Sequence, residues 1–448
     1  MLSACAPTAV ELKPPVRAPA VATPAQAASS VLVQASPASS AARAPGAIPA
    51  PAVAANPAGE TYEAWRAHFI DRAVAAGFER GFVEAELSSV QLSSAILNQD
   101  RGQPEFSRPI SDYVRAAAAP ARAAEGLKRK AAEPHLPEIE RRYGVPAEIL
   151  VAIWADESGF GKVQGDHDVI SAFATLAFEG RRREWAETQL IDALVILRDR
   201  GIPRYRLKGS WAGAMGQTQF IPEAYLKLGQ DGDGDGKVDI WGSDADALAS
   251  AANHLASEGW RPGESWAVEV LAPAGFDWSL AEGEKRSPAW WAAKGLRRAD
   301  GRPWSDKDQA SQAMLLIPTG ANGPAWLAFP NHFVIRKYNN SIAYALSIGL
   351  LADEMRGAAP LARAWPKETP LSRDQRVSAQ ASLAALGYPV GKVDGLIGAE
   401  TRTQLRAWQK SRGLVADGYL TPELVTRLNA EAATKTAATG ASVPPAVH

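Results

Sequence analysis

Hydrophobic residues recur at helical spacing over most of the chain from Thr61 onward. Tyr62, Trp65, Phe69 and Ala73 follow one another at three- or four-residue intervals, the spacing that places side chains on one face of an α-helix. The same periodicity marks the segments 138–157, 183–199, 243–258 and 340–355. Gly- and Pro-rich stretches between them predict loops. We therefore expect a mainly α domain with long irregular excursions over about 59–358.

The remaining chain divides into four parts. Residues 1–58 are rich in Ala, Pro and Ser, contain no aromatic residue and predict a disordered linker. The periodicity stops again over 359–370, which predicts a second linker. Within 371–429, two Asp-Gly turns each precede a helix start, so we expect a small three-helix domain. Residues 430–448 are expected to form a disordered tail.

Composition excludes several classes of function. The 448 residues are 46% hydrophobic and 22% charged, enough for a large core and more than one domain. A net charge of -1 gives no support for nucleic-acid binding, which requires clustered Lys and Arg. With one cysteine and six scattered histidines, neither a disulfide nor a thiolate metal cage is expected. A neutral polymer or small molecule suits the chain better as a partner, and we expect no organic cofactor.

The single cysteine, Cys5, closes the sequence Leu2-Ser3-Ala4-Cys5 directly before the Ala/Pro-rich linker. This arrangement resembles a bacterial lipobox, in which the cysteine is lipidated and a tether follows. The residues before it contain neither a basic nor an apolar signal segment. We expect lipidation at Cys5; the alternative is a disordered N-terminus that happens to contain a cysteine.

Glu157 is the first candidate for chemistry. At about 100° per residue it projects into the middle of an arc of large apolar residues formed by Ile149, Leu150, Ile153 and Trp154. A carboxyl group kept out of water favours its protonated form, which an acid catalyst requires. Asp156 falls at the edge of the arc, so we expect it nearer solvent and only Glu157 with a raised pKa. The alternative is a helix-terminal glutamate that bends into water or pairs with an arginine.

Two further segments carry polar groups in informative patterns. Residues 208–222 combine glycines with hydroxyl and amide side chains, including Ser210 and Gln219, which suits hydrogen bonding to a sugar. Downstream, Asp231, Asp233 and Asp235 alternate ahead of a turn glycine, like an EF-hand calcium loop. Its twelfth position is Gly242 instead of glutamate, and the alternative is a solvated Asp/Gly turn.

Three blocks in order carry a family resemblance: Asp156 to Gly161, Ser210 to Pro222, and Phe333 to Ala345. Together they resemble the membrane-bound lytic transglycosylase B family, glycoside hydrolase family 103, from about Tyr62 to Asp353. The segment 371–429 resembles the peptidoglycan-binding domain of bacterial wall enzymes through Leu383, Gly387, Tyr388, Asp394, Gly395, Trp408, Gln409, Asp417 and Gly418. Ala399 departs from the proline common there. The resemblance implies a lysozyme-like, α-rich catalytic domain with an EF-hand-like loop, followed by the small helical domain.

The resemblance also implies an activity. The family cleaves the β-1,4 bond between N-acetylmuramic acid and N-acetylglucosamine and leaves a 1,6-anhydromuramoyl end. A single glutamate, here Glu157, would protonate the leaving oxygen and then take the proton of the muramoyl C6 hydroxyl. Substrate would contact Ser210, Gln219, Tyr338, Asn339 and Tyr344, and Arg181 and Arg182 would hold a peptide or lactyl carboxylate. A structural Ca²⁺ would be held by Asp231, Asp233, Asp235, Lys237 and Asp246.

Two other functions stay open at this point. A hydrolytic muramidase would use water in place of the C6 hydroxyl, and a noncatalytic protein would only bind peptidoglycan. As family members do, the chain would act in the periplasm of a Gram-negative bacterium as an outer-membrane lipoprotein. Its expected partners are peptidoglycan strands, an outer-membrane lipid anchor and wall-synthesis proteins, and no nucleic acid.

Overall fold

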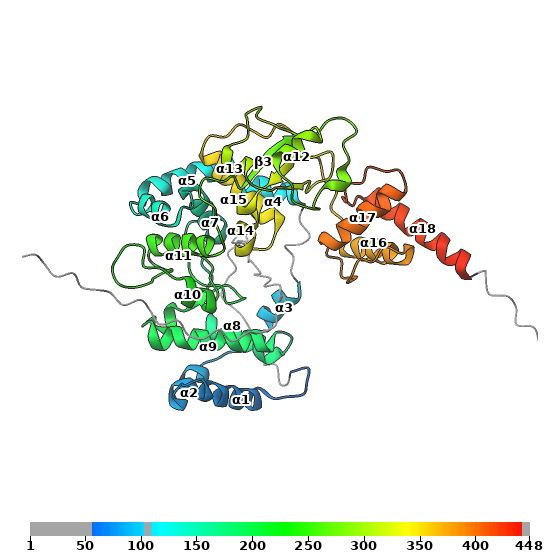
Figure 1. The fold of residues 1–448 in the computed structure, drawn as a ribbon. Helices are drawn as coiled ribbons and strands as arrows, with labels where there is room; N and C mark the ends of the chain where they lie inside the picture. Colours follow the sequence, from blue (N-terminus) through cyan, green and yellow to red (C-terminus); the bar gives the residue numbers. More distant parts are fainter. Residues whose placement is uncertain (1–55, 103–108, 441–448) are drawn as a thin grey trace, which may run out of the picture. The chain divides into compact units, whose positions relative to one another are not determined.

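The computed structural model describes residues 56–102 and 109–440, so the expectations for Cys5 and for residues 1–55 lie outside the described residues. None of the helices in these two ranges combines the length and the apolar composition that a membrane span requires. The mainly α fold expected from the periodicity is confirmed (Figure 1). Helices of the first domain are α1 (Tyr62–Ala75), α2 (Arg80–Ser88), α3 (Ser94–Gly102), α4 (Ile110–Ala117), α5 (Pro120–Ala132), α6 (Leu136–Tyr143), α7 (Ala147–Ser158), α8 (Val169–Glu179), α9 (Arg183–Asp199), α10 (Pro222–Leu228), α11 (Asp244–Ser257), α12 (Pro288–Ala293), α13 (Asp306–Gln309), α14 (Pro330–Tyr338) and α15 (Ile342–Met355).

Helix α7 lies at the centre of the main core and packs against α5, α11 and α15. Almost every residue of α7 is buried, which explains the continuous apolar run from Ile149 to Trp154. The periodic segment 138–157 forms two helices, α6 and α7. Gly144 ends α6 in the left-handed region at φ 68°, and Pro146 caps α7, so the chain turns between them.

A small sheet interrupts the helices after α11. Its strands are β3 (Ala267–Leu271), β4 (Arg297–Arg298), β5 (Met314–Leu316) and β6 (Ala325–Ala328), arranged antiparallel in the order β4-β3-β6-β5. Trp291, Leu327 and Phe329 fill a separate core beside it. We call this unit the sheet subdomain; the sequence indicated only an irregular excursion here, because strands of two to five residues leave little periodicity. A second pair, β1 (His167–Asp168) and β2 (Lys208–Gly209), joins the segment after α7 to the segment before Ser210.

The C-terminal domain is built from α16 (Arg373–Leu386), α17 (Ala399–Ser411) and α18 (Pro422–Gly440) around its own core, which includes Leu405, Trp408 and Leu428. The expectation of a disordered tail from residue 430 is wrong over 430–440, since α18 continues to Gly440. Glu431 connects this part of α18 to the domain, since its carboxylate accepts from Trp408 Nε1 at 3.1 Å and from Arg412 Nε at 2.9 Å. Residues 441–448 lie outside the described residues.

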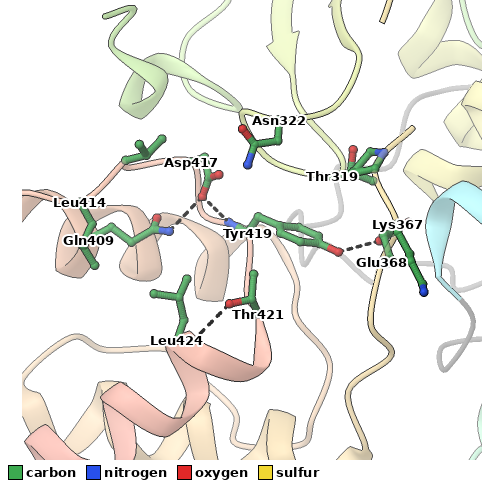
Figure 2. A pocket seen from close by; sticks show the side chains of 12 residues that line it. Thr319, Asn322, Lys367, Glu368, Gln409, Leu414, Asp417, Tyr419, Thr421 and Leu424 are labelled. Carbon is green, nitrogen blue, oxygen red and sulfur yellow. Dashed lines mark hydrogen bonds between the residues drawn. The ribbon is translucent and has the colours of Figure 1, made fainter. Parts of the chain in front are cut away.

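Polar contacts fasten the two domains to each other. Glu282 of the sheet subdomain has a positive φ of 56° and a nearly buried carboxylate, which accepts from Arg402 Nε at 2.8 Å and from Arg406 Nη1 at 3.3 Å. Figure 2 shows Tyr419 reaching to Glu368 of the linker, where its hydroxyl donates at 2.8 Å. Glu368 also accepts from the backbone N–H of Ser111 at 2.8 Å, so the linker is anchored on the first domain.

His332, on α14, supplies a pH-dependent contribution to stability. It is fully buried, and neither ring nitrogen has a hydrogen-bond partner among the described residues. Burial, and then the charges of Arg336 and Lys285, lower the pKa of His332 to about 3. Because the unfolded chain binds this proton near pH 6.5 and the folded chain does not, stability falls as the pH drops below about 6.5.

We expect His332→Phe to remove that loss. Between pH 7 and pH 5 the wild type should lose about 2 kcal/mol more unfolding free energy than the variant, measured by denaturant titration at both pH values. His254 is also buried, but it is present in both proteins. The difference between their losses of unfolding free energy therefore reports on His332 alone. Equal losses in the two chains would show that His332 is not held neutral in the folded state.

Candidate active site

Glu157 lies one residue before the C-terminal end of α7 and is 6% exposed, as the apolar arc predicts. The chain then turns sharply, because Gly159, Phe160 and Gly161 all adopt left-handed backbone with φ of 58°, 61° and 78°. At Gly161 a Cβ would lie 2.3 Å from Gln217 Oε1, so only glycine allows this close approach. The turn thereby holds segment 208–222 against the end of α7.

Tyr344 is the side chain that positions the Glu157 carboxyl group. Its hydroxyl donates to Glu157 Oε1 at 2.7 Å from the first turn of α15, and the residue is 1% exposed. Burial, and then the charge of Glu157, raise the pKa of the Tyr344 phenol well above its usual value. The phenol therefore stays protonated and acts as a fixed donor to the carboxylate.

Asp156 differs from the expectation. Its side chain is 8% exposed instead of facing solvent, and burial raises its pKa although Arg122 and the Tyr113 hydroxyl act in the opposite direction. The Tyr113 hydroxyl donates to Asp156 Oδ2 at 3.1 Å, and Arg122 Nη1 lies 3.5 Å from Oδ1. Helices α4 and α5 cover this edge of α7, which the sequence of α7 alone could not indicate. Asp156 is thus a paired structural carboxylate.

Gln217 connects α7 to the polar segment and was not singled out from the sequence. Its Oε1 accepts from Trp154 Nε1 at 2.7 Å, and its Nε2 donates to Asp244 Oδ1 at 3.0 Å. Ser158 Oγ donates to the Gln217 carbonyl at 2.8 Å. The sequence could have indicated it, because Gln217 belongs to the run of amide side chains in segment 208–222. These bonds fix that run beside Glu157.

Ser210 and Gln219 lie in the same segment, which folds back on itself. Ser210 is 5% exposed, and its Oγ accepts from the backbone N–H of Ala214 at 3.1 Å. Gln219 is half-buried with φ 53°, and its Nε2 donates to the carbonyls of Gly216 at 2.8 Å and Gln164 at 3.1 Å. Both side chains are held by backbone contacts, so they are pre-set in position.

Tyr338 and Asn339 lie at the end of α14. The Tyr338 hydroxyl donates to the Thr218 carbonyl at 2.7 Å, and its ring lies nearly parallel to that of Tyr344 at 6.4 Å. Tyr338 is 4% exposed, so it supports segment 208–222 and Tyr344 from the core. Asn339 caps the end of α14 and is half-buried.

Arg181 and Arg182 directly precede α9, and Arg182 is its N-cap residue. Both guanidinium groups pair with Asp100, which is 2% exposed; Arg181 bonds it directly and Arg182 Nη1 lies 3.5 Å away. The Arg182 guanidinium also covers the Trp185 ring at 3.8 Å. In the described residues these arginines thus have a protein carboxylate as their partner, where the sequence suggested a ligand carboxylate.

The acidic loop before α11 gathers three carboxylates. Ligand atoms of Asp231, Asp233 and Asp246 all lie within 4.8 Å of one another. Asp246 is 1% exposed and accepts from the backbone N–H groups of Gly232 at 2.7 Å and Asp239 at 2.6 Å. Asp235 is not one of the three carboxylates; its Oδ1 accepts from the Lys237 N–H at 2.8 Å, and the part of Asp235 and Lys237 in binding an ion stays a prediction. Three oxygen ligands of this kind fit a hard divalent cation.

Two family models match the chain. Residues 61–353 match the Transglycosylase SLT domain, and residues 372–428 match a peptidoglycan binding domain. The first match covers well over half of the chain and includes Glu157, segment 208–222 and the acidic loop.

Characterised proteins are similar over large parts of the chain. Membrane-bound lytic murein transglycosylase B of Escherichia coli (strain K12) is 36% identical over 217 residues, which span 47% of this chain and 57% of that protein. The structure of SltB3 from Pseudomonas aeruginosa with NAG-anhNAM-pentapeptide is 47% identical with a TM-score of 0.79, covering 83% of this chain and all of that one. Escherichia coli Slt35 in complex with calcium is 31% identical with a TM-score of 0.56, covering 65% of this chain and 92% of that one.

Proposed function

This chain belongs to the Transglycosylase SLT domain family, whose members cleave peptidoglycan, and from that premise we propose that it is a lytic murein transglycosylase with Glu157 as its acid and base. Its fold class, a lysozyme-like α-rich domain followed by a three-helix peptidoglycan-binding domain, is the one expected from the sequence. One relative is named a membrane-bound lytic murein transglycosylase, and we extend action on murein, outside the cytoplasm, to this chain. The lipid anchor at Cys5 stays a prediction.

The observation that carries the proposal is the buried Glu157 carboxyl group held by Tyr344. In the first half of the reaction Glu157 gives its proton to the glycosidic oxygen, and the bond from that oxygen to the muramoyl C1 breaks. In the second half the Glu157 carboxylate takes the proton of the muramoyl C6 hydroxyl, whose oxygen bonds to C1. The proton is back on Glu157, and no water has been consumed.

A one-carboxylate mechanism agrees with the surroundings of Glu157. Most glycosidases place two carboxyl groups on opposite sides of the scissile bond. Asp156, the adjacent carboxylate, is occupied by Arg122 and Tyr113 and projects about 100° away around the helix. An internal hydroxyl nucleophile removes the need for the second group. The pre-set polar side chains of Ser210 and Gln219 would then contact the sugars, while Tyr338 supports them from the core.

Analysis of the products tests this function. A transglycosylase leaves anhydro ends, a muramidase leaves reducing ends, and a binding protein leaves the polymer intact. The muramidase is the second candidate only because Glu157 could protonate the leaving oxygen for either nucleophile.

We propose further that Asp231, Asp233 and Asp246 hold a structural Ca²⁺. Slt35, a similar protein, is described with calcium. The ion would balance the negative charge of the three carboxylates and fix the loop that leads into α11. Asp244, the first residue of α11, accepts a hydrogen bond from Gln217 Nε2.

Calcium should therefore stabilise the fold. At about 100 times its Kd it adds about 2.7 kcal/mol, which would raise the thermal unfolding midpoint by a few degrees relative to chelator. Asp233→Asn should lose most of that increase. Asp166→Asn, which changes an exposed aspartate outside the group, should keep it. A midpoint that does not respond to calcium would exclude the site.

A further inference from the structure

A cavity of about 540 Å³, whose lining does not include Glu157, lies between the end of α11, the sheet subdomain and α14. Glu258 and Arg261 line it from the chain after α11, Lys285 and Ser311 from the sheet subdomain, and Phe333 and Lys337 from α14. None of its lining residues belongs to the group around Glu157. Its volume is in the range of ligand-binding sites.

The charge of this cavity is unbalanced, with three basic side chains and one acidic side chain in its lining. Lys337 lies 3.8 Å from Glu258, and Arg261 lies 3.5 Å from Glu264, so both contacts are long. Lys285 has no ion pair among the described residues; its Nζ lies 3.8 Å above the Phe333 ring. Burial and the charge of Arg261 lower the pKa of Lys285. The lining therefore carries an excess of positive charge.

The rest of the lining is apolar or neutral. Its apolar lining residues are Pro330, Phe333 and Val334 of α14 and Ala310 of the sheet subdomain. Ser311 is 6% exposed, and its hydroxyl has no hydrogen-bond partner among the described residues. The three basic side chains, Arg261, Lys285 and Lys337, come from different elements. They do not form one compact group of donors around a single small anion. This arrangement suits an aliphatic ligand with several separated carboxylates.

We propose that this cavity binds the stem peptide of a murein strand through its carboxylates. The proposal rests on the proposed function, which supplies murein as the substrate. A stem peptide has the required chemistry, since its glutamyl, diaminopimelyl and terminal alanyl residues carry carboxylates on short aliphatic chains. Helix α14 runs from the cavity to Tyr338, which contacts Thr218 and Tyr344. A peptide bound there would select peptide-bearing strands for cleavage.

The test compares Lys285→Gln with Lys294→Gln. Lys294 is a matched control, because it is in the same subdomain and also lies over an aromatic ring, with Nζ 5.2 Å from the Trp290 centroid, but outside the cavity. Each chain is assayed on peptide-bearing glycan strands and on strands stripped of peptide by an amidase. We expect Lys285→Gln to raise the KM for peptide-bearing strands about fivefold. Its KM for stripped strands should equal that of the wild type. The control should match the wild type on both.

An equal KM for Lys285→Gln and wild type on peptide-bearing strands would overturn the proposal, and so would an equal rise on both substrates. If the wild type cuts neither substrate, the proposed function fails, and calorimetric titration with the free tetrapeptide L-alanyl-γ-D-glutamyl-meso-diaminopimelyl-D-alanine still decides the cavity. Binding to the wild type that weakens in Lys285→Gln supports the proposal. Absent binding, or displacement of the peptide by an equal concentration of inorganic phosphate, overturns it.

Discussion

Replacing Glu157 by glutamine is expected to lower the rate of murein cleavage by about 10³-fold or more, while the fold and the binding of murein are kept. Glutamine has nearly the same shape and can still accept the Tyr344 hydrogen bond through its carbonyl oxygen. It cannot give a proton to the glycosidic oxygen or take one from the C6 hydroxyl. Initial rates on purified sacculi, at matched concentrations of folded protein, measure the effect.

Two neighbouring variants serve as controls. Tyr344→Phe removes the hydroxyl that lies 2.7 Å from Glu157 Oε1, so we expect kcat to fall about tenfold with KM unchanged. Asp156→Asn should lower stability, because Arg122 loses a buried partner, but the folded enzyme should form the same products. Substantial cleavage by Glu157→Gln, or loss of all cleavage in folded Asp156→Asn, would assign the acid to a different carboxylate.

Removing the C-terminal domain is expected to weaken binding to sacculi at least about tenfold and to leave cleavage of soluble glycans unchanged. The domain has a core of its own, separate from the cores of the first domain. The chain should be cut after Pro370, because the linker belongs to the first domain: Trp365 packs on Trp326, and Glu368 accepts from the Ser111 N–H. Sedimentation with sacculi measures the binding.

The cut removes Arg402 and Arg406 and leaves Glu282 without these two partners. A second truncated chain carries Glu282→Gln, which removes that uncompensated charge. If it binds sacculi as weakly as the first truncated chain, the weaker binding is due to loss of the domain. If both truncated chains sediment like the full chain, the C-terminal domain has no targeting role.

Much of the fold could be predicted because its helices are long and periodic. The segment 183–199 forms α9 with the expected bounds, and 340–355 contains α15. The short strands of the sheet subdomain gave no such pattern. The helix beyond residue 430 was not predicted, because the partners of Glu431, Trp408 and Arg412, come from another part of the domain.

The candidate site was predictable only where one segment determines the surroundings of a side chain. The apolar arc of α7 was enough to bury Glu157. Asp156 was misjudged because Tyr113 and Arg122, which cover it, come from α4 and α5. The Asp100 partner of Arg181 and Arg182 is likewise distant in sequence. Long-range contacts of this kind decide which partners a polar side chain has in the folded protein, and the ligand role of Arg181 and Arg182 stays a prediction.

The most direct test of the account is mass spectrometry of the products that the wild-type chain and Glu157→Gln release from purified murein. If Glu157 transfers the proton to the leaving oxygen and the C6 hydroxyl attacks, wild-type products are lighter by one water than reducing-end muropeptides, and Glu157→Gln releases none. Reducing-end products from the wild type would contradict it, because water and not the muramoyl C6 hydroxyl would then be the nucleophile.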